Sequence, residues 1–440
     1  MTAVDYAANY LMEREFQTVS APWGGRLGDL LVFIIPASQL VEFDVVGRLF
    51  APDVILLALL PVVLLSKAHF LKMRLPRTFL VLGLIWFAGQ VTTDFVRSTP
   101  FEDYARGWAM IAFTLTNFSV LYVLLFQNAR RIVIYTVGSA IGNLLIYFLH
   151  PGGFAVGDPW KFGYGFEITA FLVLLATFPR VRSTNLATPA ILIFAAALNV
   201  YNGARSLGGA CFLVGTYLLM RQIARACREQ GSPMTFAGAL FMCALLALSA
   251  VGVLQIYQYY AGNGLLGYAA QQKYEMQSSG RYGVLVGGRG DFLVALEAAL
   301  DSPIVGHGSW AKDWRYASQE DAIVKGLGYR TLGGANSWLI PAHSHLIGAW
   351  VDAGILGIVF WIWVLSLPLR VLMQLYATAE PLAPLIAFLA VILIWDVLFS
   401  PYGAERRFLT PYYVIVMMYL LDRSTNLLLP AKSGNAFWAE

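Results

Sequence analysis

The sequence has few charged residues, and this scarcity excludes most classes of soluble protein. Asp, Glu, Lys and Arg make up 13% of the 440 residues, whereas 58% are hydrophobic. Soluble domains carry roughly 25% charged residues, and disordered chains and coiled coils carry more. The composition therefore predicts a polytopic membrane protein. The net charge of +4 is small, and no basic stripe indicates a nucleic-acid partner.

Cysteine is also scarce. The three cysteines, Cys211, Cys227 and Cys243, lie within or beside apolar segments, and their spacing matches neither a zinc site nor a Cys-x-x-Cys motif. We therefore expect neither a disulfide framework nor a cysteine metal site. The segment before Arg26 contains no apolar h-region, so a cleavable signal peptide is not expected.

Long apolar runs are abundant. Because a helix that crosses a bilayer needs about 20 mainly apolar residues, the sequence predicts an all-α fold with about 12 transmembrane helices. Pro36, Glu42 and Asp44 interrupt the first window, which leaves open whether it crosses the membrane. The windows lie near 28–47, 50–66, 78–93, 107–126, 132–149, 163–178, 186–202, 206–220, 234–258, 344–366, 383–400 and 408–421.

Lys and Arg cluster after every second window, which predicts that these connections and both termini are cytoplasmic. Residues 259–342 then form a large outward loop with seven basic and seven acidic residues. A structureless loop of this length would be unusual, and Phe292 to Leu300 has the spacing of a short amphipathic helix that ends before Pro303. The predicted organisation is an N-terminal segment 1–27, spans one to nine in 28–258, the loop 259–342, spans ten to twelve in 343–421, and a tail 422–440.

Three arginines on the outward side are candidates for binding an anion. Arg205 lies in a tight turn that has no other charge, and glycines there leave room for a polar ligand. Arg281 and Arg289 lie among glycines, a setting that suits a phosphate because a guanidinium donates two hydrogen bonds side by side. Alternatively, Arg205 reaches lipid headgroups, and the two loop arginines are solvated or paired with Asp291 or Glu297.

His343 is the candidate general base. It lies at the outward start of span ten, where helical spacing would put it on one stripe with Gly354 and Gly357. The helix N-terminus would keep its imidazole neutral, as a general base requires. His345 lies on another face of that helix. The alternatives are a structural histidine, or a metal bound by His343 and His345, although no nearby Cys or Glu completes such a site.

These elements resemble the O-antigen ligase and polymerase family of bacterial envelope glycosyltransferases. The sequence His343-Ser344, nine residues to Ala353, Gly354 and then Gly357 is similar to a motif of that family. So is the run from Gly288-Arg289 through an amphipathic helix to Pro303-x-x-Gly306-x-Gly308. The resemblance covers roughly 195–370; Leu293, Ser344 and Ala204 depart from the residues common in the family.

The resemblance implies an inverting transferase of GT-C-like fold in the bacterial inner membrane, with its active site facing the periplasm and no metal or other cofactor. Its donor would be a glycan on undecaprenyl diphosphate, and its partners would include membrane lipids. His343 would be the base, Arg205 and Arg289 would stabilise the leaving diphosphate, and Arg281, Ser344 and His345 would bind substrate. The acceptor would be lipid A core in a ligase, or the growing glycan in a polymerase of O-antigen or exopolysaccharide repeat units.

A lipid-linked glycan flippase or another transporter is the alternative from a different class. Charged residues in or near the spans, Glu167, Asp352 and Asp396, favour it, but the sequence has no paired halves. The sugar, the acceptor, the oligomeric state and any partner that sets chain length are left open.

Overall fold

The structure is a computed structural model of the chain. It describes residues 25–184, 186–227, 244, 248, 251–252, 254–265, 267–280, 290–319 and 338–428. Arg281, Arg289 and most of the ninth predicted span, 234–258, lie outside these described residues. Most of the predicted N-terminal segment and of the predicted tail lies outside them too.

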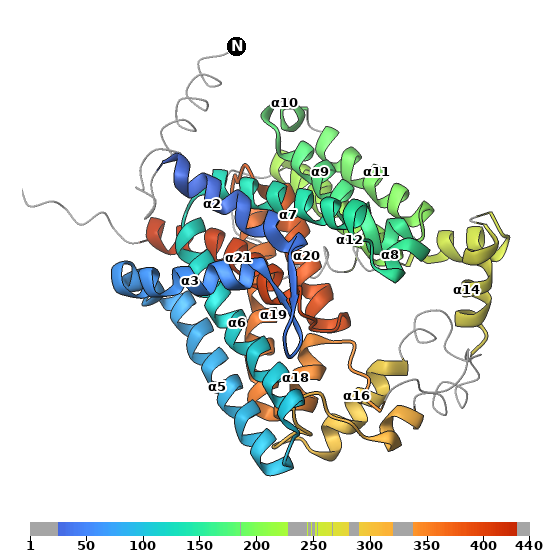
Figure 1. Cartoon of the computed structure of the whole chain (residues 1–440). Coiled ribbons are helices and arrows are strands. Elements are labelled where there is room, and N and C mark those ends of the chain that lie inside the picture. The colour runs from blue at the N-terminus through green and yellow to red at the C-terminus, as the bar shows by residue number, and fades with distance from the viewer. Residues whose placement is uncertain are drawn as a thin grey trace, which may run out of the picture.

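Within the described residues the chain is mostly helical, which confirms the all-α prediction apart from one short ribbon (Figure 1). The first half contains α2 (Arg26–Ala37), η1 (Ser38–Leu40), α3 (Ala51–Ser66), α4 (Ala68–Leu71), α5 (Arg74–Arg97), α6 (Phe101–Leu125), α7 (Ala129–Leu149), α8 (Gly153–Gly157), η2 (Trp160–Tyr164), α9 (Gly165–Thr177), α10 (Pro179–Arg182) and α11 (Ala187–Tyr201). The second half contains α12 (Arg205–Cys227), α14 (Tyr268–Ser278), α16 (Gly290–Asp301), α18 (His345–Ala353), α19 (Ile355–Ala377), α20 (Ala383–Phe399) and α21 (Arg406–Leu428).

Local sequence explains where several of these helices begin. Asn128 caps α7, because its side chain accepts a hydrogen bond from the backbone N–H of Arg131 at 3.1 Å. At the start of α3 the contact runs the other way: Asp53, in the first turn of the helix, accepts a hydrogen bond from the N–H of the preceding Phe50 at 3.2 Å. A proline in the first turn of α3 and of α20 suits a position where the missing N–H has no helical partner.

Five of the described helices are long and apolar enough to cross a membrane. They are Arg74–Arg97, Phe101–Leu125, Ala129–Leu149, Arg205–Ala224 and Ile355–Ala377. Three shorter apolar helices, α3, α11 and α20, coincide with further windows. The structure thus supports a membrane protein and does not confirm the count of 12.

The first window, 28–47, is not one helix. α2 ends at Ala37 after 12 residues, a length of about 18 Å against the roughly 30 Å of a bilayer core. The chain then forms an antiparallel ribbon of β1 (Glu42–Asp44) and β2 (Arg48–Phe50), in which Glu42 pairs with Phe50 and Asp44 with Arg48. Pro36 and the acidic residues that interrupt the window thus mark the end of a helix and the start of a polar ribbon.

The core lies between α5, α6, α19, α20 and α21, which contact one another in the centre and lower part of the molecule (Figure 1). Aromatic rings join the first three of these helices: Phe79 stacks on Phe118 at 3.9 Å, and Phe360 lies 5.2 Å from Phe79 and 5.0 Å from Trp86. Helices α7, α9, α11 and α12 extend this core toward the top and right.

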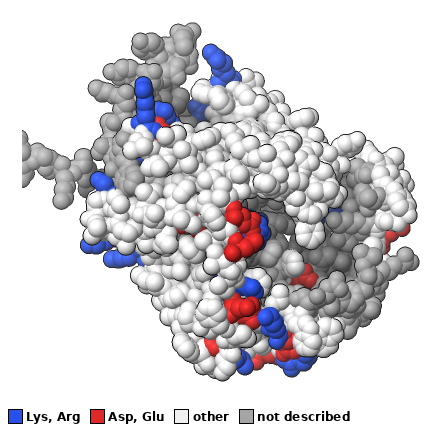
Figure 2. Space-filling view, in the orientation of Figure 1, with Lys and Arg blue, Asp and Glu red and all other residues white. Residues whose placement is uncertain are grey.

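Charged side chains are rare on the face shown in Figure 2. Acidic side chains gather beside a central hollow and, together with Lys and Arg, along the lower end, while further Lys and Arg lie at the upper and left edges. In Figure 1 the lower end is where α5 and α6 meet and where α16 lies. The few charged residues are therefore distributed unevenly over this face.

The tenth window, 344–366, is two helices. α18 ends at Ala353, and α19 begins at Ile355. Gly354 between them has a φ of 63° and a ψ of −151°, which are open to glycine but strained for any other residue. The prediction that His343, Gly354 and Gly357 share one helical stripe is therefore wrong, because His343 precedes α18 and the helix breaks before Gly357. Gly354 instead lets the loop at Ile304 approach, since a Cβ there would collide with the Ile304 carbonyl oxygen.

We expect Gly354→Ala to destabilise the protein by about 2 kcal/mol or more, because alanine is strained in this conformation and also collides with Ile304. The melting temperature of the purified protein in detergent measures this. Gly209→Ala is the matched control: Gly209 lies in α12 with no atom within 4 Å of an added Cβ, so alanine should leave or raise the melting temperature. Equal melting temperatures for Gly354→Ala and the unsubstituted chain would contradict the role assigned to Gly354.

Candidate functional site

A cavity of about 430 Å³ lies at the junction of α5, α6, α16, α18 and α19. Residues from three connecting segments complete its lining: 310–317, 339–344 and 401–402. The lining includes His343, Ser344 and His345, three residues that the sequence singled out. It also includes Asp291 and Asp352, which the sequence did not single out as members of a common site.

One face of α18 forms much of the cavity wall. His345, Gly348, Ala349 and Asp352 all line it, and their spacing of three, four and seven residues places them on one side of a helix. Because Gly348 has no side chain and Ala349 has only a methyl group, a hollow is left between the imidazole of His345 and the carboxyl of Asp352. Asp352 could have been found from this spacing, which is visible in the sequence.

Ser344 fixes where α18 begins. Its hydroxyl oxygen accepts a hydrogen bond from the backbone N–H of Ile347 at 3.1 Å, and its proton is donated to the carbonyl oxygen of Val397 at 2.9 Å. The side chain therefore caps α18 and ties it to the end of α20. These contacts position the histidines on either side of Ser344.

His343 lies at the rim of the cavity and is paired with Asp291. Its Nδ1 lies 2.5 Å from a carboxylate oxygen of Asp291, and the two side chains are 57% and 28% exposed. Asp291 comes from the first turn of α16, which packs against α18. The sequence placed Asp291 beside Arg289 as a possible partner of that arginine, and its pairing with a histidine 52 positions later was not foreseen.

His345 lies deeper and is buried. Its Nδ1 contacts the carbonyl oxygen of Ser400 at 2.7 Å, so this nitrogen carries the proton and donates it. The ring meets Trp361 and Tyr402 edge to face, with centroids 4.9 Å and 4.8 Å away. The other nitrogen, Nε2, is buried without a hydrogen-bond partner. Within the described residues, no group of three or more His, Cys, Asp or Glu side chains is placed to hold a metal ion.

The ends of α5 and α6 hold the loop that forms one cavity wall. Asp94 accepts hydrogen bonds from the N–H and the hydroxyl of Ser309, both at 2.7 Å, and from the indole of Trp108 at 2.8 Å. Arg97 donates to the carbonyl oxygen of Gly306 at 2.7 Å. Ser309 directly precedes Trp310, which lines the cavity. The loop is thus anchored to the helices beneath it.

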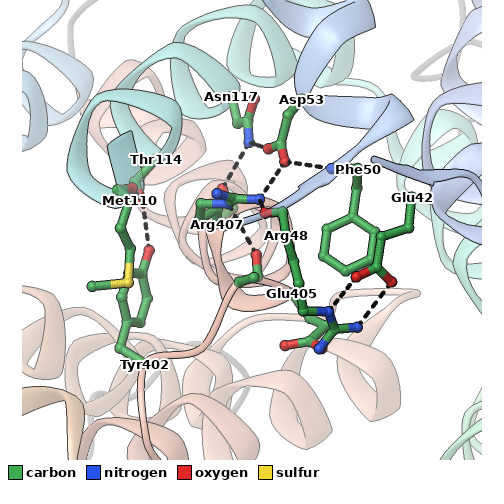
Figure 3. A network of polar contacts seen from close by, with 11 residues as sticks. Glu42, Arg48, Phe50, Asp53, Met110, Thr114, Asn117, Tyr402, Glu405 and Arg407 are labelled. Carbon is green, nitrogen blue, oxygen red and sulfur yellow. Dashed lines mark hydrogen bonds and ion pairs between the residues drawn. The ribbon is translucent and has the colours of Figure 1, made fainter. Parts of the chain in front are cut away.

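A second group of charges lies where the ribbon, α3 and α6 meet the connection between α20 and α21 (Figure 3). The buried carboxylate of Asp53 accepts from Arg407 at 2.7 Å and from Asn117 at 2.8 Å. Nearby, Arg48 bonds Glu42 at 2.5 Å and Glu405 at 2.7 Å. The Glu42 hydrogen bond raises the pKa of Arg48 above its usual range, and the nearby Glu405 carboxylate adds to this effect.

These contacts fix the short connection between α20 and α21. Its Tyr402 lines the cavity and shares a 2.7 Å hydrogen bond with Thr114. Arg406, next to Arg407, forms an ion pair with the buried carboxylate of Asp396. Asp396, one of the charges that favoured a transporter, is therefore part of an anchor for this connection.

Of the three candidate arginines, the structure describes only Arg205. Arg205 begins α12, donates a hydrogen bond to the hydroxyl of Tyr257 at 3.0 Å, and has its guanidinium 4.9 Å from the centre of that ring. Arg205 is not among the residues that line the cavity. Arg281 and Arg289 lie outside the described residues.

Comparison with known proteins adds no relative: no family model matches the sequence, and no curated protein matches it. The family resemblance therefore rests on the motif residues alone. Of these, the structure places His343, Ser344, Gly306, Gly308, Gly354 and Gly357 around one junction, where the loop meets α18 and α19.

We expect Asp94→Asn to loosen the loop around Ser302 to Lys312, because an amide cannot accept from all three donors and places its own N–H₂ toward one of them. Hydrogen bonds to a charged group contribute about 1.5–3 kcal/mol, so amide exchange in this loop should accelerate roughly tenfold or more. Hydrogen exchange followed by mass spectrometry measures it. Asp44→Asn, at an exposed ribbon position, is the control. Unchanged exchange in the loop would refute the anchoring role.

Proposed function

We propose that this chain is an inner-membrane glycosyltransferase that moves a glycan from undecaprenyl diphosphate to a hydroxyl of an acceptor sugar, with its cavity facing the periplasm. The observation that carries the proposal is the pair of His343 and Asp291 at the rim of the cavity. A histidine held by a carboxylate, partly exposed beside a space that can hold a substrate, is the arrangement of a general base. The motif around His343 supports the same activity.

In the proposed reaction, the acceptor hydroxyl gives its proton to His343 while its oxygen attacks the anomeric carbon of the donor sugar. The bond from that carbon to the diphosphate oxygen breaks, and the electron pair leaves with the lipid diphosphate. A single displacement of this kind inverts the anomeric centre. Asp291 holds the ring through Nδ1 and stabilises the imidazolium that forms, so Nε2 is the nitrogen that would take the proton.

The departing diphosphate needs positive charge or hydrogen-bond donors, and we assign this role to Arg205 and Arg289, with Arg281 as a further contact. Arg205 stands at the first position of α12, where backbone N–H groups and the positive end of the helix dipole also favour an anion. Its stacking on Tyr257 holds the guanidinium in one orientation. No metal ion is required in this scheme.

We expect His343→Ala to abolish transfer while the protein level and membrane insertion stay normal. Asp291→Asn should lower kcat by roughly 100- to 10,000-fold with little change in the KM for the acceptor, because it disorders the base without removing a substrate contact. Transfer from a purified undecaprenyl-diphosphate glycan in detergent measures both.

The control is Glu297→Gln, on the exposed side of the same helix α16, which should keep full activity. Full activity in His343→Ala would refute the general-base assignment. A loss in Asp291→Asn that appears only in the acceptor KM would make Asp291 a binding residue instead of a positioning residue.

The acceptor separates two forms of this proposal, and we favour a ligase that uses lipid A core over a polymerase that uses the growing glycan. Deletion of the gene in its native host, followed by gels of the envelope glycans, distinguishes them. We expect all capped lipopolysaccharide to disappear. Lipopolysaccharide capped with single repeats would indicate an O-antigen polymerase, and intact lipopolysaccharide with missing exopolysaccharide would indicate a polymerase of the secreted polymer.

A further inference from the structure

The floor of the cavity, below the rim where His343 lies, contains polar atoms that the protein leaves without partners. The indole Nε1 of Trp86, the indole Nε1 of Trp361 and the Nε2 of His345 are all buried without a hydrogen bond, and all three residues line the cavity. They come from α5, α19 and α18, so three separate helices converge here. Buried polar atoms in folded proteins are nearly always paired, so three unpaired ones around one cavity, among the described residues, indicate that it suits an occupant with hydrogen-bonding groups.

The carboxyl of Asp352 belongs to the same floor. It lies on the α18 face that carries His345, and no hydrogen bond or ion pair joins it to another described side chain. The backbone around it is fixed, because its carbonyl oxygen accepts from the N–H of Gly308 at 3.1 Å and from the side chain of Gln90 at 3.4 Å. The backbone of Asp352 is thus held in place, and its side chain lines a cavity that also contains aromatic rings.

The charges of the lining indicate which part of a substrate suits the floor. The described lining contains two carboxyls, Asp291 and Asp352, and neither Lys nor Arg. The Asp291 carboxylate would repel a diphosphate, which would also find no cation among these residues. An uncharged group with several hydroxyls fits instead, because each hydroxyl both donates and accepts.

The aromatic residues of the floor narrow the choice of ligand to a sugar. Trp86, Trp361 and Tyr402 place ring surfaces beside the hollow over Gly348 and Ala349. Ring surfaces pack against the C–H faces of a sugar, while the two indole N–H groups, the imidazole nitrogen and the carboxyl match its hydroxyls. An aliphatic lipid tail would satisfy the rings but would leave all four polar groups unpaired.

We propose that this floor, made by Trp86, His345, Asp352 and Trp361, binds one neutral sugar ring of the acceptor and so presents an acceptor hydroxyl to His343 at the rim. The inference rests on the proposed transferase function and adds to it the place and charge of the acceptor sugar. The donor diphosphate, by contrast, belongs at the arginines outside the described lining.

Binding of free sugars tests this without any transfer reaction. Saturation-transfer NMR with the full-length protein in lipid nanodiscs would use glucose, galactose and N-acetylglucosamine as neutral probes, and glucuronate and pyrophosphate as charged ones. We expect at least one neutral sugar to bind and the charged probes to bind more weakly. Asp352→Asn exchanges the carboxyl for an amide of the same shape, and Trp361→Phe removes one N–H donor together with one ring of the indole. Each should weaken binding of the neutral sugar about tenfold.

Trp363→Phe is the matched control, because Trp363 lies two residues away in α19 and does not line the cavity. Its affinity for sugars should equal that of the unsubstituted chain. Absence of neutral-sugar binding, or equal affinity in all three variants, would overturn the inference. Preferential binding of pyrophosphate would overturn it as well and would assign the floor to the donor.

The His343→Ala variant separates this inference from the proposed function. It should bind neutral sugars normally while failing to transfer glycan. If it transfers glycan fully and sugar binding still depends on Asp352, the general base is wrong and the sugar site stands. If it is inactive and no neutral sugar binds to the unsubstituted chain, the sugar site is wrong and the transferase proposal stands.

Discussion

The contact between two stretches of backbone, 304–308 in the loop and 351–354 at the end of α18, is the constraint on which the rest of the site depends. The N–H of His307 donates to the carbonyl oxygen of Val351 at 2.6 Å, and that of Gly308 to Asp352 at 3.1 Å. These carbonyls belong to the last turn of a helix, where no intrahelical partner exists. The loop therefore supplies hydrogen-bond donors to the carbonyl oxygens left free where the helix breaks at Gly354. The break in turn sets the direction in which α18 presents its cavity face.

Buried charge plays a positioning role around this contact. Asp53 with Arg407 and Asp396 with Arg406 hold the connection after α20, while Asp94 holds the loop before Trp310. Removing two charges from water costs about as much as their attraction returns, so such pairs are weak sources of stability but hold one geometry. A chain with only 13% charged residues thus uses several of them to position the walls of one cavity.

The sequence is informative where one physical signal dominates. Apolar length alone finds α5, α6, α7 and α12 as candidate spans, and helical spacing before Pro303 finds α16. Prediction from the sequence fails where the local structure depends on residues that are distant along the chain. The window 344–366 is apolar throughout, so hydropathy cannot detect that Gly354 adopts a positive φ against Ile304. The pairing of Asp291 with His343 likewise depends on how α16 packs on α18, and nothing within ten residues of Asp291 indicates it.

The distribution of charge gives the proposed reaction a direction. A displacement at the anomeric carbon needs the attacking hydroxyl and the departing diphosphate on opposite sides of that carbon. The Asp291 carboxylate and the absence of Lys and Arg from the described lining make the cavity unfavourable for a diphosphate, while its polar groups suit a hydroxyl-rich acceptor. Arg205, which stands outside the cavity lining at the start of α12, favours the anion instead. In the proposed arrangement, electrostatics would keep the two substrates apart except at the rim, where His343 would take the proton.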